Sequence, residues 1–309
     1  MDIKTNTVLL ATVVTVIFIF SRNVRVVTAK NFHLGVLIPW DGFWAVGPHV
    51  AGAVNVALDD ILSDPRFAAI HNGGHNITYA WRNDECTASI GLYETIDLWS
   101  GKFDGTPMDA MIGSGCSVVC EPTGLLTAKW EIPQVSWNCA SSLLSDKGLY
   151  PTFARTVAPY TKLTGFFITI FQHYNWDHVA ILTSQENLWK IAAMAMRDEF
   201  EMNNITVSAF EEFSPGHDQF TEDDVWKQHR ALENAAQVSR VFILCVYGGD
   251  ARNLVLHAYD KGLLNGNYVF YMIEISTLDI QFGVNTWMGD DGRDDDAIKA
   301  FEGANKLEP

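Results

Sequence analysis

The sequence predicts an α/β protein with two lobes, each built on a parallel β-sheet that has helices on both faces. Two observations support this fold class. Short apolar runs alternate along the chain with stretches in which apolar residues recur at helical spacing. This alternation restarts near residue 160, after an extended connector, so one sheet is expected to be complete before the next begins. A chain of 309 residues is long enough for two domains.

The first lobe is expected between residues 30 and 153. Strands are predicted at short apolar runs, and helices where apolar residues recur every three or four positions. Pro122 is expected in the first turn of its helix, where the missing N–H of proline costs no hydrogen bond. The predicted strands are 32–39, 77–81, 110–113 and 132–137, and the predicted helices are 47–63, 90–99 and 122–130.

Residues 154–309 are expected to form the crossover and a partial second lobe, with an extended connector at 150–160. Two lobes joined in this way would form a hinged clam, which binds its ligand in the cleft or on the faces of the lobes. The predicted helices are 161–174, 187–202, 222–236 and 251–264, and the predicted strands are 178–183, 205–210, 241–246 and 268–273.

The composition is that of a globular protein, with 48% hydrophobic and 19% charged residues. The formal net charge of −16 argues against a nucleic-acid partner, because phosphate binding requires clustered Lys and Arg. An acidic surface fits an extracellular domain that meets cationic ligands, and it also fits a surface that only keeps the protein in solution.

The N-terminal residues 1–29 are typical of a secretory signal peptide. Lys4 precedes an apolar run at 8–20, and small residues stand at 27–29 before Lys30. The run is shorter than a membrane-spanning helix, although a signal anchor is an alternative. Two N-glycosylation sequons, at Asn76 and Asn204, also indicate export.

No segment has the pattern of a metal site or of a catalytic site. The C-x₃-C pair at Cys116 and Cys120 has no second pair nearby to complete a zinc site. The histidines of 71–75 (HNGGH) are separated by two glycines that disfavour a helix, so a surface loop is expected. The acidic stretch 290–296 lacks the glycine and glutamate of a calcium-binding loop and is interpreted as a solvated loop.

The turn Gly113-Ser114-Gly115-Cys116 follows a predicted strand, at the sheet edge where parallel sheets bind ligands. Its backbone N–H groups could bind an anion, but it lacks the lysine and the length of a phosphate-binding loop. A tight turn that requires glycine is the favoured interpretation.

Several short motifs occur in a characteristic order and spacing. They are Gly115-Cys116, 121–124 (EPTG), 128–133 (AKWEIP), 150–162 (YPTFARTVAPYTK), 266–271 (GNYVFY) and Ile273-Glu274. From about Phe32 to the C-terminus this pattern resembles the extracellular region of natriuretic peptide receptors and related receptor guanylate cyclases, the ANF-receptor family. The stretch 150–162 is the most specific part.

The resemblance implies a fold, a function and partners. The family fold is the type I periplasmic-binding-protein clam. Its members dimerise outside the cell and bind a peptide, and the signal passes through one transmembrane helix to a cyclase domain that makes cGMP. A homodimer formed through first-lobe helices, including Trp99, is therefore expected here.

The resemblance also implies site residues. Cys86 and Cys116 match the family's first-lobe disulfide. Cys120 and Cys139 follow two consecutive strands whose ends should meet, so a second disulfide is expected there. Cys245 is then left as the odd thiol. In the natriuretic branch a chloride ion lies near the Gly-Cys turn, which here would be held by Gly115 and Cys116, although the family's additional hydroxyl ligand has no match around residues 79–84.

The sequence departs from the family in length, since it stops at Pro309, within the expected second lobe. We therefore expect an incomplete second lobe, no enzyme activity, and membrane attachment only through absent C-terminal segments or a signal anchor. A soluble carrier or sensor of an amino acid or another small molecule, with Ser136 and Ser141–Ser142 as ligand donors, is the alternative function. No catalytic constellation supports an enzyme of the same fold class.

Overall fold

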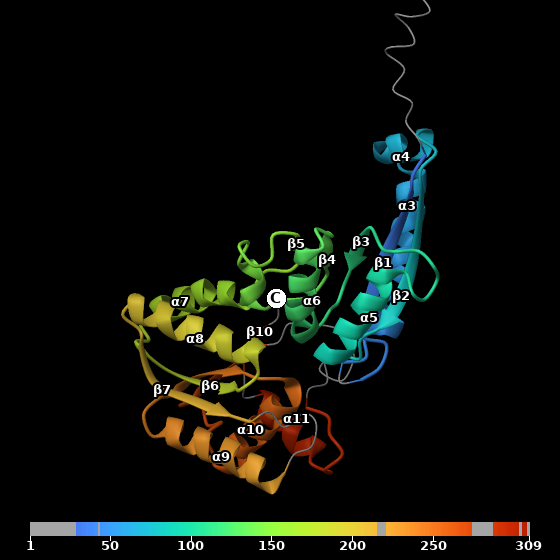
Figure 1. The fold of residues 1–309 in the computed structure, drawn as a ribbon. Coiled ribbons are helices and arrows are strands. Elements are labelled where there is room, and N and C mark those ends of the chain that lie inside the picture. Colours follow the sequence, from blue (N-terminus) through green and yellow to red (C-terminus); the bar gives the residue numbers. More distant parts are fainter. Residues whose placement is uncertain (1–28, 43, 215–220, 274–286, 303–304, 308–309) are drawn as a thin grey trace, which may run out of the picture. The chain divides into compact units, whose positions relative to one another are not determined.

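The computed structural model describes residues 29–42, 44–214, 221–273, 287–302 and 305–307 (Figure 1). Two parallel sheets flanked by helices form the fold, which confirms the predicted α/β class. The chain divides into two compact units, one made of residues 1–32 with 53–78 and the other of residues 33–52 with 79–309. The predicted signal peptide lies outside the described residues except for Ala29.

The first sheet has five strands in the order β2-β1-β3-β4-β5. The registers of β1 with β3, β3 with β4, and β4 with β5 are all parallel. The last strand lies within the segment that we expected to be a connector, so this lobe has one strand more than the sequence predicted. The bounds are β1 Asn31–Ile38, β2 Asn76–Asn83, β3 Ala110–Ile112, β4 Gln134–Ser136 and β5 Phe153–Arg155.

Five α-helices occur between these strands. The helix predicted at 47–63 is divided at Ala51 into a short helix and a longer one. In the connection that follows, the predicted loop 71–75 begins inside a further short helix. The bounds are α2 Gly47–Val50, α3 Gly52–Ser63, α4 Ala68–Asn72, α5 Ala88–Ser100 and α6 Ser117–Lys129.

The predicted position of Pro122 in a first helical turn is wrong, because α6 begins at Ser117 and Pro122 lies in its interior. A proline at this position removes the backbone donor for the carbonyl group of Val118. The Val118 side chain is 51% exposed, so this part of the helix faces water, which can satisfy the carbonyl. The helix therefore starts directly after the Gly-Ser-Gly turn, five residues before the proline.

A buried polar network fixes α6 against the first sheet. Gln134 of β4 has no exposed surface, and its Nε2 donates to the carbonyl oxygen of Gly113 at 3.0 Å and to Thr123 Oγ1 at 3.1 Å. Its Oε1 accepts from Thr127 Oγ1 at 2.9 Å. Because the amide group of Gln134 is used on both sides, its burial carries little desolvation penalty, and the network sets the position of the helix along the strands.

The second sheet has the order β10-β9-β8-β6-β7, and every neighbouring pair is parallel. The strands are β6 His178–Ser184, β7 Thr206–Phe213, β8 Val241–Cys245, β9 Val269–Ile273 and β10 Asn305–Leu307. The helices are α7 Leu163–Tyr174, α8 Asn187–Met202, α9 Glu222–Ala236, α10 Gly248–Asp260 and α11 Asp294–Glu302.

Alternate residues of the central strands face two separate cores, as expected when helices cover both faces of a sheet. Ile181 and Ile243 pack among residues of α7 and α8. Leu182 and Leu244 pack among residues of α9 and α10 on the other face. This arrangement explains why the strands read as continuous apolar runs rather than as alternating ones.

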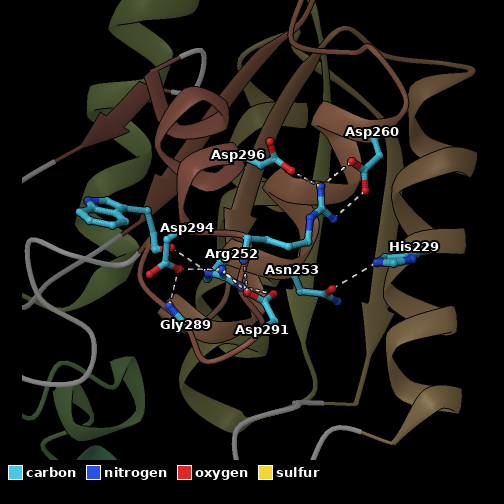
Figure 2. A network of polar contacts seen from close by, with 10 residues as sticks. His229, Arg252, Asn253, Asp260, Gly289, Asp291, Asp294 and Asp296 are labelled. Carbon is cyan, nitrogen blue, oxygen red and sulfur yellow. Dashed lines mark hydrogen bonds and ion pairs between the residues drawn. The ribbon is translucent and has the colours of Figure 1, made fainter.

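The acidic stretch 290–296 is an exposed loop at Asp290 and Asp291, as predicted, but its last three acidic residues begin α11 and arginines hold several of its carboxylates. Arg252 of α10 donates to both carboxylate oxygens of Asp291 at 2.7 Å and to the carbonyl oxygen of Trp287 at 2.8 Å (Figure 2). It also contacts Asp294 at 3.1 Å, and Asp294 begins α11. The hydrogen bond from Arg252 lowers the pKa of Asp291 to about 2. One guanidinium group therefore fastens residues 287–294 to α10.

Replacing Arg252 by alanine is expected to increase amide hydrogen exchange in residues 287–296 by about tenfold, because about 1.4 kcal/mol of local opening free energy is lost with these charged hydrogen bonds. Hydrogen exchange followed by mass spectrometry measures this directly. Arg197→Ala, which removes a surface pair with Asp198, is the matched control and should leave the segment unchanged. Unchanged exchange in Arg252→Ala would contradict the anchoring role.

Candidate functional site

The strand order of the first sheet indicates which edge of that sheet would bind a ligand. The chain passes from β1 to β2 on one side and then to β3 on the other side of β1. In open parallel sheets, ligands bind beyond the carboxyl ends of the strands at such a reversal. We call this region the first-sheet edge and define it as residues 39–41, 81–86, 113–116 and 136–139.

Glycine is required at two positions of the turn after β3. Gly113 has φ +101°, a left-handed conformation that L-residues with a side chain rarely adopt. A Cβ on Gly115 would lie 2.3 Å from the ring of Trp137. Trp137 stacks on Trp44 with a centroid distance of 5.5 Å, so the turn passes tightly against an aromatic pair. These contacts support the tight-turn interpretation of both glycines.

Ser114, in the middle of this turn, is buried and hydrogen bonded at two atoms. Its carbonyl oxygen accepts from Ser136 Oγ at 2.7 Å, and its Oγ accepts from the backbone N–H of Cys116 at 3.0 Å. The turn after β3 is thereby tied both to the end of β4 and to the start of α6. The backbone N–H of Cys116 already has an acceptor within the protein, and chloride binding by Gly115 and Cys116 stays a prediction.

Two disulfides enclose the turn. Cys86 pairs with Cys116, and Cys120 pairs with Cys139, the same two pairs that are named in the sequence analysis. Cys245 is unpaired and buried in β8, where burial raises the pKa of its thiol. A thiol with a raised pKa is a poor nucleophile, so Cys245 acts as a small apolar residue of the core that Ile181 and Ile243 form with α7 and α8.

Asp84 is the electrostatically unusual residue of the first-sheet edge. It has no exposed surface, and its Oδ1 accepts from the backbone N–H of Cys86 at 2.8 Å. Burial raises the pKa of this carboxyl group to about 6, in spite of the hydrogen bond with Ser114, which lowers it. A carboxyl group next to the Ser114 turn competes with any free anion there.

An exposed aromatic pair lies beside this buried carboxyl group. The rings of Trp40 and Trp81 have centroids 5.2 Å apart and are 40% and 46% exposed. Asn83 positions the pair, because its Oδ1 accepts from the backbone N–H of Trp40 at 2.7 Å while its Nδ2 donates to Asp41 at 2.6 Å. Asn83 Oδ1 also accepts from the backbone N–H of Glu85 at 3.2 Å. The result is an aromatic surface next to two acidic residues.

Trp40, Trp81, Asn83 and Asp84 are not among the site residues predicted from the sequence. A polar run, Asn83-Asp84-Glu85, lies at the carboxyl end of β2, and this signal could have indicated the edge. The pairing of Trp40 with Trp81 depends on the register of β1 and β2, which one sequence does not reveal.

The hydroxyl groups of Ser136 and Ser142, two serines of the alternative small-molecule site, are used within the protein, and Ser141 is held through its backbone. Ser136 Oγ donates to Ser114 and accepts from the backbone N–H of Cys139 at 3.0 Å. The backbone N–H of Ser141 donates to Ser117 Oγ at 3.1 Å, and Ser142 Oγ donates to Thr161 Oγ1 at 3.3 Å. These serines stabilise the loop after β4, and an amino-acid ligand would have to compete with those contacts.

The second sheet reverses its order at β6, between β7 and β8. Beyond the carboxyl end of β6, Ser184 Oγ donates to Glu186 Oε2 at 2.7 Å, just before α8 begins. Trp189 of α8 stacks on Tyr160 with a centroid distance of 5.0 Å, and both are buried. The Tyr160 backbone N–H donates to the carbonyl oxygen of Ala140 at 3.2 Å. Tyr160, which belongs to the motif at 150–162, is therefore a buried packing residue. It offers no exposed group to a ligand.

The remaining predicted residues lie on the surface. Asn76, at the start of β2, and Asn204, before β7, are both exposed, as N-glycosylation requires. Trp99 of α5 is 41% exposed and stacks on Trp130 with a centroid distance of 4.4 Å. Within the described residues, no group of three potential metal ligands converges on one point. No described helix is both long and apolar enough to cross a membrane.

Comparisons with known proteins give one matching family and several relatives. Residues 49–307 match the family described as the receptor family ligand binding region, the ANF receptor family. The resact receptor of Arbacia punctulata is 25% identical over 242 residues, which cover 77% of this chain and 23% of that protein. Retinal guanylyl cyclase 2 of Rattus norvegicus is 25% identical over 258 residues, 80% of this chain and 21% of that protein.

A third relative is matched over most of this chain. Atrial natriuretic peptide receptor 3 of Rattus norvegicus is 22% identical over 285 residues, which cover 91% of this chain and 51% of that protein. The chain thus spans between about a fifth and a half of the length of these relatives.

Proposed function

Because this chain belongs to the ANF receptor family of receptor ligand-binding regions, we propose that it is the extracellular, peptide-binding part of a cell-surface receptor. The observation that carries the proposal is the family match, which includes nearly all of both sheets. The name of atrial natriuretic peptide receptor 3 supports a peptide as the ligand class. The receptor carries the signal onward by raising cGMP, a step for which the relative named as a guanylyl cyclase is the support.

The first-sheet edge supplies a contact surface for such a peptide. Trp40 and Trp81 offer apolar area that is already ordered, so little conformational entropy is lost when a ligand covers them. Tryptophan is also enriched among the residues that dominate binding energy at interfaces. Asp41 and Glu85 at the same edge, together with the net charge of −16, favour a peptide with basic side chains.

A binding experiment tests this function. The secreted, glycosylated protein is titrated by calorimetry with a panel of extracellular peptides that includes atrial natriuretic peptide, and separately with free amino acids. Binding of a peptide is expected, with affinity falling about 30-fold, or about 2 kcal/mol, in the Trp40→Ala/Trp81→Ala variant. Trp226→Ala, which removes an exposed tryptophan of α9, is the control and should bind normally. Binding of amino acids alone would overturn the peptide-receptor function.

The proposed receptor is a dimer formed through the outer faces of α5 and α6. Tyr93, Ile96 and Trp99 recur on one side of α5, and Val118 and Leu125 are exposed on α6. These side chains are between 41% and 54% exposed, and together they make an apolar surface of the kind that marks an interface.

Replacing Trp99 by alanine is expected to weaken this dimer at least tenfold, because an aromatic residue at the centre of an interface contributes about 2 kcal/mol or more. Sedimentation velocity over a range of protein concentrations measures the effect. Phe103→Ala, which removes another exposed aromatic residue outside the two helices, is the control. If Trp99→Ala sediments as the unaltered protein does, Trp99 is not part of the interface.

A further inference from the structure

A cavity of about 670 Å³ lies at the amino ends of β6, β8 and β9 in the second sheet, and its function is not explained by ligand binding at the first-sheet edge. Its volume falls in the range of about 300–1,000 Å³ that is typical of small-molecule sites. The loops that line it run from Asn175 to His178, from Ala236 to Val241 and from Gly266 to Val269. It lies on the edge of the sheet opposite to the one where parallel sheets usually bind ligands.

The lining of this cavity suits a carbohydrate. One wall is Trp176, whose ring stacks on the exposed Tyr174 with a centroid distance of 4.9 Å. The rest of the lining is rich in polar groups, which include Asp177, Arg240 and Asn267. A sugar needs this combination, because its ring has an apolar face and its edges carry hydroxyl groups that donate and accept hydrogen bonds.

A sugar attachment point lies next to the cavity. Strand β7 pairs with β6 so that Thr206 is opposite His178, and the backbone N–H of Thr206 donates to the carbonyl oxygen of Asp177 at 2.7 Å. Asn204 precedes Thr206 by two residues and lies in the turn between α8 and β7, with φ +59°. Neighbouring strands are about 4.8 Å apart, so the chain at Thr206, two residues after Asn204, is about one strand spacing from Asp177 of the cavity wall.

We propose that the cavity at the amino ends of β6, β8 and β9 binds the N-linked glycan carried by Asn204, whose first sugars fill it. This inference rests on the proposal that the chain is secreted and glycosylated. Attachment at Asn204 gives the sugar a high effective concentration at the cavity, so contacts too weak to hold a free sugar are sufficient. The bound glycan covers Trp176 and links the turn before β7 to the loops before β8 and β9.

Site-resolved deglycosylation of the native protein tests this proposal. The protein is secreted from cells that produce high-mannose glycans and is treated with endoglycosidase H, and release at Asn76 and Asn204 is followed by glycopeptide mass spectrometry. In the Arg240→Ala/Asn267→Ala variant, which removes two exposed polar side chains of the cavity, release at Asn204 is expected to become about tenfold faster. The rate at Asn76 stays the same and serves as the internal control.

The variant Arg197→Ala/Asn234→Ala is the matched control, because it removes the same two side-chain types outside the cavity and should leave both rates unchanged. Equal release at Asn204 in the unaltered protein and in the cavity variant overturns the proposal, as does an Asn204 that carries no glycan. If the protein fails this test but still binds peptides, only the proposal about the cavity is wrong. Failure of this proposal and failure of the proposed receptor function are therefore distinguishable.

Discussion

Replacing both Cys86 and Cys116 by alanine is expected to lower the free energy of unfolding by about 3.6 kcal/mol. The two cysteines are 30 residues apart, and their bond restricts a loop of that length in the unfolded chain. In the folded protein, the bond joins the loop after β2 to the start of α6, so its loss also frees the segment that contains Asp84 and Asn83. Urea unfolding under non-reducing conditions measures the change.

The matched control for this variant is Cys245→Ala. Cys245 is buried but unpaired, so its replacement removes a sulfur atom from a core without removing a cross-link. We expect a loss of about 1 kcal/mol for that substitution, the size of a small cavity. If both variants unfold at the same urea concentration, the disulfide contributes no more than packing does.

The loss of the disulfide should also disturb the proposed ligand-binding surface at the first-sheet edge. Asn83 positions Trp40 through a single hydrogen bond of 2.7 Å, and Asn83 lies three residues before Cys86. We therefore expect peptide affinity to fall in the double cysteine variant even at temperatures where the protein is fully folded. The stability of the fold and the order of the first-sheet edge depend on the same bond.

Much of the fold was predictable because its elements are long and periodic. The helices α8 and α9 have the bounds that the sequence predicted, 187–202 and 222–236. In α9 the reason is local, since Thr221 and Asp224 form a capping box that fixes the first turn. The division into two sheets was predictable because the alternation of strands and helices restarts near residue 160. Within each sheet, a helix serves as the crossover that joins one parallel strand to the next.

The errors occur where tertiary contacts decide the structure. Strand β5 has only three residues and lies two positions after a proline, so its sequence carries no strand signal, and its pairing with β4 is what defines it. Pro122 is tolerated inside α6 because that side of the helix faces water. The candidate site was only partly predictable for the same reason. The glycine turn and the cysteines are visible in the sequence, whereas the burial of Asp84 depends on three loops meeting at one sheet edge.

Replacing Asp84 by asparagine is expected to stabilise the protein at pH 7.4 by up to about 3 kcal/mol. Burial raises the pKa of Asp84 from 3.8 in the unfolded chain to about 6 in the folded protein. The folded state therefore binds more protons than the unfolded state between these two values, and stability falls as the pH rises through that window. A difference of 2.2 pKa units at 1.36 kcal/mol each gives the magnitude. Asparagine avoids this loss because it stays neutral and keeps an oxygen acceptor for the backbone N–H of Cys86.

Urea unfolding at a series of pH values checks this expectation. Below pH 3.8 Asp84 is protonated in both states, so the variant and the unaltered protein should differ little, and the advantage of asparagine should grow up to about pH 6 and then remain constant. Asp59→Asn, at an exposed carboxylate, is the control and should leave the pH dependence of stability unchanged. An advantage that is independent of pH would mean that the pKa of Asp84 is the same in the folded and unfolded states, which would contradict the raised pKa of the buried carboxyl group.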